Sequence, residues 1–126
     1  MPHYWPTVEP WIAAALAGRS VQLLPEDIYE GCLVQKIQMW LAMADAAPVA
    51  AAVSRIDRYP RAVICTMIAI GGSGVDDWLL KFEPEIAAWA EARGCSYIEG
   101  AGRRGWERKA KHYTPVYTIY RRKLRG

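Results

Sequence analysis

AVICTMIAIGGSGV, residues 62–75, is the stretch that decides the fold. Its first nine residues, 62–70, are rich in β-branched side chains and are apolar at both alternating sets of positions. A strand that is apolar on both faces is typical of the centre of a sheet that is covered above and below. The glycine-rich run 71–74 then ends the strand. The stretch predicts a central strand followed by a tight turn.

A long helix is predicted directly after the glycine run. Ser73 and Asp76 match the S-x-x-D pattern of a helix start, and Arg93 and Gly94 match a helix end. Pro84 lies inside the segment and predicts a kink or a break near Phe82. The apolar stripe of this helix consists of Val75, Leu79, Phe82, Ile86, Trp89 and Ala90. Residues 95–100, CSYIEG, then predict a short strand, parallel to the central strand.

Upstream of the central strand, the pattern predicts an antiparallel meander. Residues 36–44 alternate, and residues 49–57 place Val49, Ala51 and Val53 on one face. Two helices are predicted before the meander. Thr7 is the expected cap of the first, over residues 8–17, and the second follows Pro25.

Two further elements are predicted at the C-terminal end: a short basic helix over residues 102–112, and a final strand over Thr114 to Arg121, where TPVYTIYR alternates. The chain therefore predicts a single α/β domain over residues 1–126. We expect a mixed sheet of about six strands with helices on both faces.

Composition supports a folded domain with an uneven charge. Of 126 residues, 52% are hydrophobic and 23% charged, which favours a packed core over disorder. Residues 1–102 carry 7 basic and 12 acidic side chains, a balance of −5, while residues 103–126 carry 9 basic and 1 acidic, a balance of +8. The basic end could meet a phosphorylated cofactor, an acidic protein surface or nucleic acid.

Several classes of protein are disfavoured by the sequence. No run approaches the roughly 20 apolar residues of a membrane span, and the N-terminus lacks the features of a secretory signal. The three cysteines lie about 30 residues apart without a CxxC pair, so we expect core thiols in a reducing compartment and no metal site.

The order of the elements resembles the GNAT family of N-acetyltransferases over nearly the whole chain. More specifically, the stretch from Tyr59-Pro60-Arg61 through ICTMIAIGG, PEIAAWAEARGC and GRRGWER is similar to small GNAT-like proteins of tailed bacteriophages. The resemblance implies a sheet that splays at its centre, between residues 62–70 and 95–100, where GNAT enzymes bind acetyl-CoA.

The resemblance implies a coenzyme site in the loop after the central strand. In GNAT enzymes this loop carries an R/Q-x-x-G-x-G/A pattern, and its backbone N–H groups hold the pyrophosphate at a helix N-terminus. The matching residues here are Gly71, Gly72, Ser73, Gly74 and Val75. The Arg or Gln is missing, and Asp76 and Asp77 add negative charge. The alternative is a tight turn in which Ser73 serves only as the helix cap.

Two catalytic roles follow from the same resemblance: a base that takes a proton from the amine, and a tyrosine that protonates the departing thiolate. Tyr113 is the position that best matches the tyrosine, with Tyr117 and Tyr120 as weaker matches. Glu99 and Asp57 are the candidate bases. The alternative is that the tyrosines pack with surface hydroxyls and that Glu99 pairs with a nearby arginine.

The GRRGWERKAK segment supplies further candidates for phosphate binding. Arg103 and Arg104 are expected to contact the phosphates of CoA, with Arg108 and Lys109 as possible additions. Nucleic acid is disfavoured as the partner because aromatic residues are not interleaved with the basic ones. Trp106 is either an interface anchor or a side chain packed on the sheet.

The resemblance thus implies a phage-encoded protein that binds acetyl-CoA and transfers the acyl group directly to a small or protein amine. The alternative is a non-catalytic virion or assembly component, or a module that binds a host protein, on the same scaffold. Either protein would lie in the host cytoplasm or in the virion, without a membrane partner.

Overall fold

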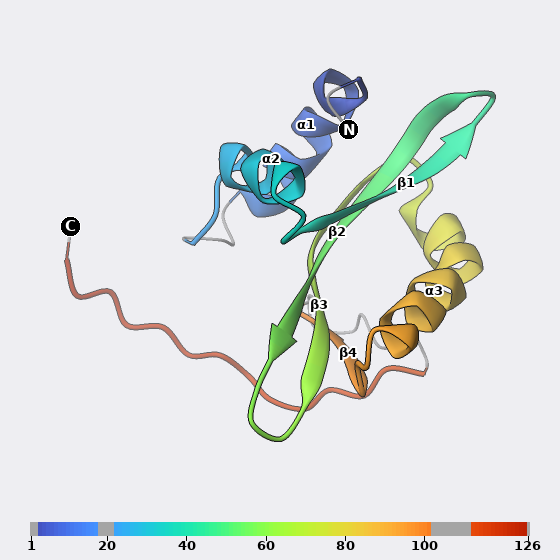
Figure 1. The fold of residues 1–126 in the computed structure, drawn as a ribbon. Coiled ribbons are helices and arrows are strands. Elements are labelled where there is room, and N and C mark those ends of the chain that lie inside the picture. Colours follow the sequence, from blue (N-terminus) through green and yellow to red (C-terminus); the bar gives the residue numbers. More distant parts are fainter. Residues whose placement is uncertain (1–2, 18–21, 102–111, 126) are drawn as a thin grey trace.

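A four-stranded mixed sheet forms the centre of the computed structural model, which describes residues 3–17, 22–101 and 112–125 (Figure 1). The strands lie in the order β1–β2–β3–β4, the first three antiparallel and the last parallel to β3. Their bounds are β1 Gln38–Ala44, β2 Ala47–Arg58, β3 Val63–Gly72 and β4 Tyr97–Gly100. The predicted central strand is confirmed, because β3 lies between β2 and β4.

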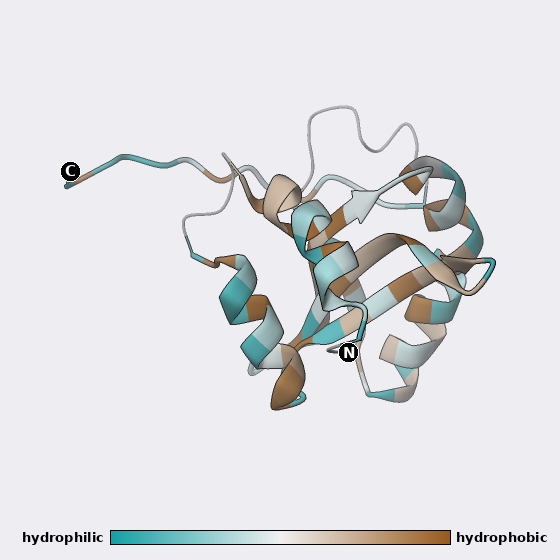
Figure 2. Ribbon diagram, turned by 90° about the horizontal axis from the view of Figure 1, so that it is seen from above, coloured by the Kyte–Doolittle hydropathy of each residue, from teal (hydrophilic) through white to brown (hydrophobic). Residues whose placement is uncertain are grey.

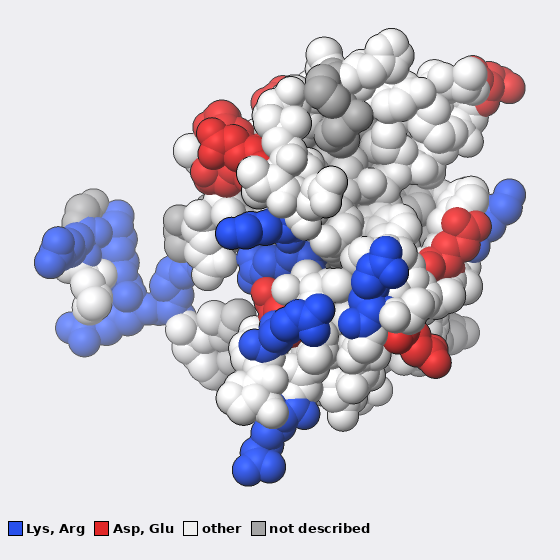
Figure 3. All heavy atoms as spheres, in the orientation of Figure 1, with Lys and Arg blue, Asp and Glu red and all other residues white. Residues whose placement is uncertain are grey.

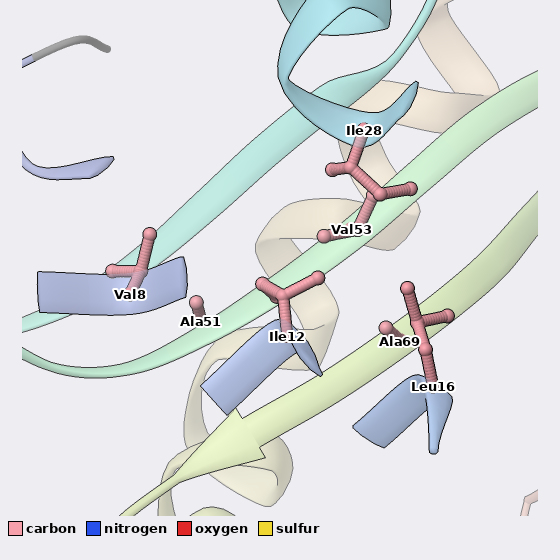
Figure 4. Close-up of a cluster of buried hydrophobic side chains, with 7 residues drawn as sticks. All are labelled: Val8, Ile12, Leu16, Ile28, Ala51, Val53 and Ala69. Carbon is pink, nitrogen blue, oxygen red and sulfur yellow. The ribbon is translucent and has the colours of Figure 1, made fainter. Parts of the chain in front are cut away.

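Three helices cover the sheet within the described ranges: α1 (Trp5–Leu16) and α2 (Pro25–Leu33) pack on one face, and α3 (Val75–Ala92) packs on the other (Figure 1). Alternation along β2 serves both layers: Ala51 and Val53 join the core under α1, while Ala50 and Ala52 join the core under Trp78 of α3. Figure 4 shows the first core, made of Val8, Ile12, Leu16, Ile28, Ala51, Val53 and Ala69. The predicted helices on both faces are therefore confirmed.

The residue that begins α1 differs from the prediction. Tyr4, not Thr7, is the N-cap, and it makes no side-chain capping bond. Pro6, which is pre-organised for a first helical turn, lets the helix begin earlier. The second predicted helix is confirmed as α2, where the Leu24 N–H donates to the Asp27 carboxylate over 2.8 Å.

The start of α3 also differs, because Gly74 and not Ser73 is its N-cap. Gly74 has a φ of 64°, a left-handed conformation that suits glycine, while the Ser73 N–H is bonded to the Val49 carbonyl. Of the predicted kink or break near Phe82, the break does not occur, since α3 is continuous from Val75 to Ala92. Pro84 is exposed, so the hydrogen bond it removes leaves a carbonyl that water can reach.

The prediction of a final strand over residues 114–121 is wrong. The described residues form four strands, whereas the sequence predicted about six. Residues 114–125 are extended but belong to no helix or strand. Alternation fixes which face a side chain prefers, but a strand also needs a neighbouring edge to receive its N–H and C=O groups. The helix predicted over residues 102–112 falls almost wholly outside the described residues.

One side chain of the predicted meander lies on the opposite face. Val49 packs in the core under Trp78, not with Ala51 and Val53. The cause is a register shift between the pairs Ala42↔Ala50 and Met43↔Pro48, which leaves Val49 as an extra residue. A bulge of this kind reverses the alternation on one side of itself.

Candidate functional site

The strands β3 and β4 pair over only four of the ten residues of β3. Their pairing ends at Met67↔Gly100, while β3 continues to Gly72. Within the described residues, the edge of β3 that faces away from β2 therefore has no strand partner over residues 68–72. The same point carries a bulge, because Val53 pairs with Ala69 and Ser54 with Met67. Beyond Met67, this edge of β3 leads to the start of α3 without a strand partner among the described residues.

Two of the loop glycines are explained by packing. A Cβ added at Gly71 would lie 2.8 Å from the carbonyl oxygen of Trp11, so only glycine lets α1 approach here. A Cβ at Gly72 would lie 2.5 Å from the Cα of Ala50, and its φ is +116°. Neither glycine needs a ligand to account for its identity.

Gly74 is different, because its added Cβ would meet nothing within 4 Å. It stands at the N-terminus of α3, where the first N–H groups of a helix, here those of Val75 and Asp76, cannot find acceptors inside the helix. Such groups attract anions. The Ser73 N–H is already bonded to the carbonyl of Val49. The backbone N–H groups that could bind an anion are therefore those of residues 74–76. The side chain of Asp77 is exposed beside them, and that of Asp76 falls outside the described part.

Tyr113 lies against α3 beside a buried carboxylate that the sequence reading missed. Glu83 is only 9% exposed, and its Oε2 lies 2.6 Å from Nε2 of His112. Burial first, and then the charge of Glu83 and its hydrogen bond with the phenol, raise the pKa of Tyr113. Tyr113 therefore stays protonated well above neutral pH. The signal for Glu83 was its spacing, four residues after Leu79 and three before Ile86, on the inward face of the helix.

The two candidate bases lie two register positions apart in the sheet but differ in what surrounds them. Asp57 accepts hydrogen bonds from Arg55 Nε over 2.9 Å and from the Thr66 hydroxyl over 2.7 Å. Glu99, which is half-buried on β4, is the register partner of Thr66. No ion pair between Glu99 and an arginine is recorded among residues 3–17, 22–101 and 112–125. Asp57 is already engaged, so Glu99 is the better base.

Glu99 and Tyr113 lie on opposite faces of the sheet. Cys65 and its register partner Ile98 pack against α3, so the next residues along, Thr66 and Glu99, point to the other face. Tyr113 lies on the α3 face, next to Glu83 and close to Cys65. The two groups could act on one ligand only if it lay in the gap between the strands.

Two of the remaining candidates are not brought to this site. Tyr117 and Tyr120 are 70% and 91% exposed on the extended C-terminal residues. Arg103, Arg104 and Trp106 belong to the undescribed range 102–111. In the described ranges, no three His, Cys, Asp or Glu side chains gather as metal ligands, and no helix has the length and apolar character to cross a bilayer. The cysteines Cys32, Cys65 and Cys95 are free.

Comparison with known proteins gives a match by structure only. No family model and no curated protein matches the sequence. Among solved structures, an aminoglycoside N-acetyltransferase in complex with CoA is 13% identical with a TM-score of 0.69, covering 98% of this chain and 91% of its own. A ribosomal-protein-alanine N-acetyltransferase from Brucella melitensis biovar Abortus 2308 is 16% identical with a TM-score of 0.66, covering 97% and 94%.

A transcriptional regulator from Bacillus halodurans C-125 is also similar, 11% identical with a TM-score of 0.69, covering 98% of this chain and 95% of its own. At such identities the likeness concerns the fold, and the same scaffold can carry different functions. The chain therefore has a GNAT-like α/β fold whose structural neighbours include acetyltransferases.

Proposed function

We propose that the chain is an acyl-CoA-dependent N-acyltransferase that transfers the acyl group directly to an amine. One observation carries the proposal: β3 loses its β4 partner after Met67 and then runs to the N-terminus of α3 with no other described strand on that edge. This edge of β3 offers backbone N–H and C=O groups, and the start of α3, which follows it directly, offers N–H groups.

The chemical groups of acetyl-CoA suit the edge of β3 and the start of α3. Its thioester arm contains amide groups, which could hydrogen-bond with this edge of β3 as a strand would. Its pyrophosphate is an anion that the N–H groups of the N-cap Gly74 and of Val75, the first residue of α3, could receive. In this proposal Gly71 and Gly72 shape the turn by packing, and Ser73 contributes only its hydroxyl.

The proposed transfer needs no covalent enzyme intermediate. The amine nitrogen attacks the thioester carbonyl, the carbon–sulfur bond breaks, and the thiolate leaves. Glu99, directly or through water, takes the proton that the amine loses. Tyr113 gives a proton to the thiolate, a role for which a phenol that stays protonated is suited. In this proposal the amine acceptor approaches from the face of the sheet where Glu99 lies. The thiolate leaves on the opposite face, where Tyr113 lies.

The experiment that tests the proposal is a calorimetric titration with acetyl-CoA at low and at moderate salt. Micromolar binding, weakened at least tenfold when Arg103 and Arg104 are both changed to Glu, would support it. Because the Arg or Gln of the GNAT pattern is missing, we expect weaker binding with strong salt dependence. No binding at millimolar acetyl-CoA would rule the proposal out.

A non-catalytic role on the same scaffold is the second candidate. The observation in its favour is that Gly71 and Gly72 are required by Trp11 and Ala50 and not by a ligand. Failure of acetyl-CoA to bind would favour this candidate, as a module that binds another protein. The phage origin, and with it a location in the host cytoplasm or the virion, stays a prediction of the sequence resemblance.

A further inference from the structure

We propose that Glu83 and His112 form a proton relay that returns a proton from the solvent to Tyr113. The inference deepens the proposed function and rests on it for its purpose, because Tyr113 needs a new proton only after it has given one to the thiolate. The observations that support it are the partners of Glu83, the burial of this carboxylate and the exposure of His112.

Within the described residues, Glu83 contacts two groups that can each give up a proton. Its Oε2 lies 2.6 Å from Nε2 of His112, whose ring N–H donates to the carboxylate. The phenol of Tyr113 is hydrogen-bonded to the same side chain. An arginine partner would instead hold the charge of the carboxylate fixed, because a guanidinium does not lose its proton. The contacts of Glu83 therefore suit proton transfer.

The basic residues of the described chain are not recorded as partners of this carboxylate. Among residues 3–17, 22–101 and 112–125, no ion pair joins a Lys or Arg to Glu83. The basic far end of the chain, residues 121–125, forms a cluster apart from the body of the molecule (Figure 3). The charge of Glu83 is therefore balanced locally by its contact with His112 when the imidazole is protonated.

The three side chains lead from the interior of the protein to its surface. Glu83 is 9% exposed, and Tyr113 is half-buried. The side chain of His112 is 60% exposed. The C-terminal segment that carries it passes close to β4 and then leaves the body of the molecule (Figures 1 and 2). The imidazole can therefore exchange protons with water directly.

The neighbours of Tyr113 favour a route through Glu83. Burial first, and then Glu83, raises the pKa of Tyr113, so the phenolate left after the transfer is a strong base. Cys65 is the other titratable group near the phenol, but it is 0% exposed, and burial raises the pKa of its thiol. A thiol that water does not reach cannot renew its own proton, whereas Glu83 leads to an exposed imidazole.

The relay moves one proton for each acyl transfer. His112, as the imidazolium, gives its Nε2 proton to Oε2 of Glu83, and the carboxyl group gives a proton to the phenolate oxygen of Tyr113. The neutral imidazole then takes a proton from hydronium in the solvent. Glu99 releases to the solvent the proton that it took from the amine, so the protons balance. Glu83 and His112 act through Tyr113 and do not touch the reacting atoms.

The test is the exchange rate of the Tyr113 hydroxyl proton with water, which needs neither coenzyme nor acceptor. Protein labelled with ¹³Cζ-tyrosine in equal amounts of H₂O and D₂O gives two Cζ signals when this exchange is slow and one when it is fast. Tyr113→Phe identifies the signal. We expect His112→Gln, which keeps an N–H donor but cannot release its proton, to slow the exchange about tenfold or more. Glu83→Gln should slow it similarly.

A purely structural role for the pair predicts the opposite sign. Loss of an anchor would open the contact with α3 and speed the exchange of the Tyr113 hydroxyl. Glu91→Gln, which removes a carboxylate at an exposed position of the same helix, is the control and should change the rate less than about twofold. Because His112 is exposed, His112→Gln should keep its fold by circular dichroism and decides the matter if Glu83→Gln does not fold.

Unchanged or faster exchange in His112→Gln would overturn the relay. The outcome does not depend on the acetyl-CoA titration that tests the proposed function. If acetyl-CoA fails to bind while His112→Gln slows the exchange as expected, the proposed acyl transfer fails and the proton path from His112 to Tyr113 stands. If acetyl-CoA binds while the exchange is unchanged, the transfer stands and Tyr113 regains its proton by another route.

Discussion

The imidazole of His112 lies 2.6 Å from the carboxylate of Glu83, although 29 positions separate the two residues in the sequence. A carboxylate only accepts hydrogen bonds, so the His112 ring N–H at Nε2 is the donor. Glu83 is buried under this contact, while the side chain of His112 is 60% exposed. The pair fastens the start of the C-terminal segment to α3 and places Tyr113 against the same carboxylate.

Removing the carboxylate should loosen this attachment. Glu83→Ala leaves His112 and Tyr113 without their shared partner, so we expect the free energy of unfolding to fall by about 1–3 kcal/mol. Urea denaturation measures this. Glu91→Ala, at an exposed position of the same helix, should change stability by less than about 0.5 kcal/mol. Equal effects of the two substitutions would contradict the role given to Glu83.

Tyr113 should make the fold sensitive to alkali. Burial, followed by Glu83, raises the pKa of its phenol in the folded state. The protonated phenol therefore contributes its full stabilisation to the folded state below the ordinary phenol pKa of about 10. This stabilisation is lost as the pH rises above that value. Tyr113→Phe has no proton to lose, so its stability should fall less steeply above pH 10 than that of the unmodified protein. Chemical denaturation at pH 8, 9.5 and 10.5 compares the slopes; parallel slopes would refute the prediction.

The loop glycines should respond differently to a methyl group. Gly71→Ala places a Cβ 2.8 Å from a backbone oxygen of Trp11, which cannot move aside, so we expect a loss of about 1–3 kcal/mol. Gly74→Ala meets no atom and should cost only the left-handed conformation, about 1–2 kcal/mol. If Gly74 borders the coenzyme, only its substitution should also weaken acetyl-CoA binding beyond the effect of stability. Thermal unfolding and calorimetry give the two readouts.

Ser54 links two strands through a fully buried hydroxyl. It accepts a hydrogen bond from Trp40 Nε1 and donates one to Gln38 Oε1, each over 2.9 Å. Ser54→Ala removes both hydrogen bonds from their half-buried partners, at a cost of about 1–3 kcal/mol. Ser96→Ala, at an exposed position, is the control. A Ser54→Ala protein as stable as the control would show that water replaces the hydroxyl.

The order of the elements could be predicted because it follows from local patterns. The doubly apolar β3, the meander and the helix after the glycine run all depend on periodicity within about 15 residues. Glu83, by contrast, is buried by His112 and Tyr113. No local sequence pattern predicts contacts between residues so far apart in the sequence. The final strand over residues 114–121 failed for a related reason, since its alternation says nothing about which edge receives it.

The candidate site likewise has features that the sequence predicts and features that only the structure shows. The glycine run was visible in the sequence, but only the contacts at Trp11 and Ala50 show that Gly71 and Gly72 are packing residues. The assignment of Glu99 and Tyr113 to opposite faces depends on the register between β3 and β4 and on the return of the chain to α3. Register across a sheet is not encoded in any one segment.

The last prediction concerns the charge at the start of α3. Asp77 is exposed in the first turn of α3, where a carboxylate stabilises the helix but would repel a pyrophosphate bound at Gly74 and Val75. Asp77→Asn should therefore tighten acetyl-CoA binding about three- to tenfold at low salt, which corresponds to about 0.7–1.4 kcal/mol. The gain should shrink at about 0.5 M salt, because screening is then strong.

A matched control separates the local effect from the net charge. Glu91→Gln changes the charge by the same amount near the opposite end of α3 and should leave acetyl-CoA affinity within a factor of two. Stability gives a second readout, since Asp77→Asn should cost about 0.3–1 kcal/mol of helix-end stabilisation whether or not the coenzyme binds. If stability falls by that amount while affinity is unchanged, Asp77 serves only the helix start. The anion site at Gly74 and Val75 would then have to be abandoned, because a phosphate held there would lie within a turn of the removed charge.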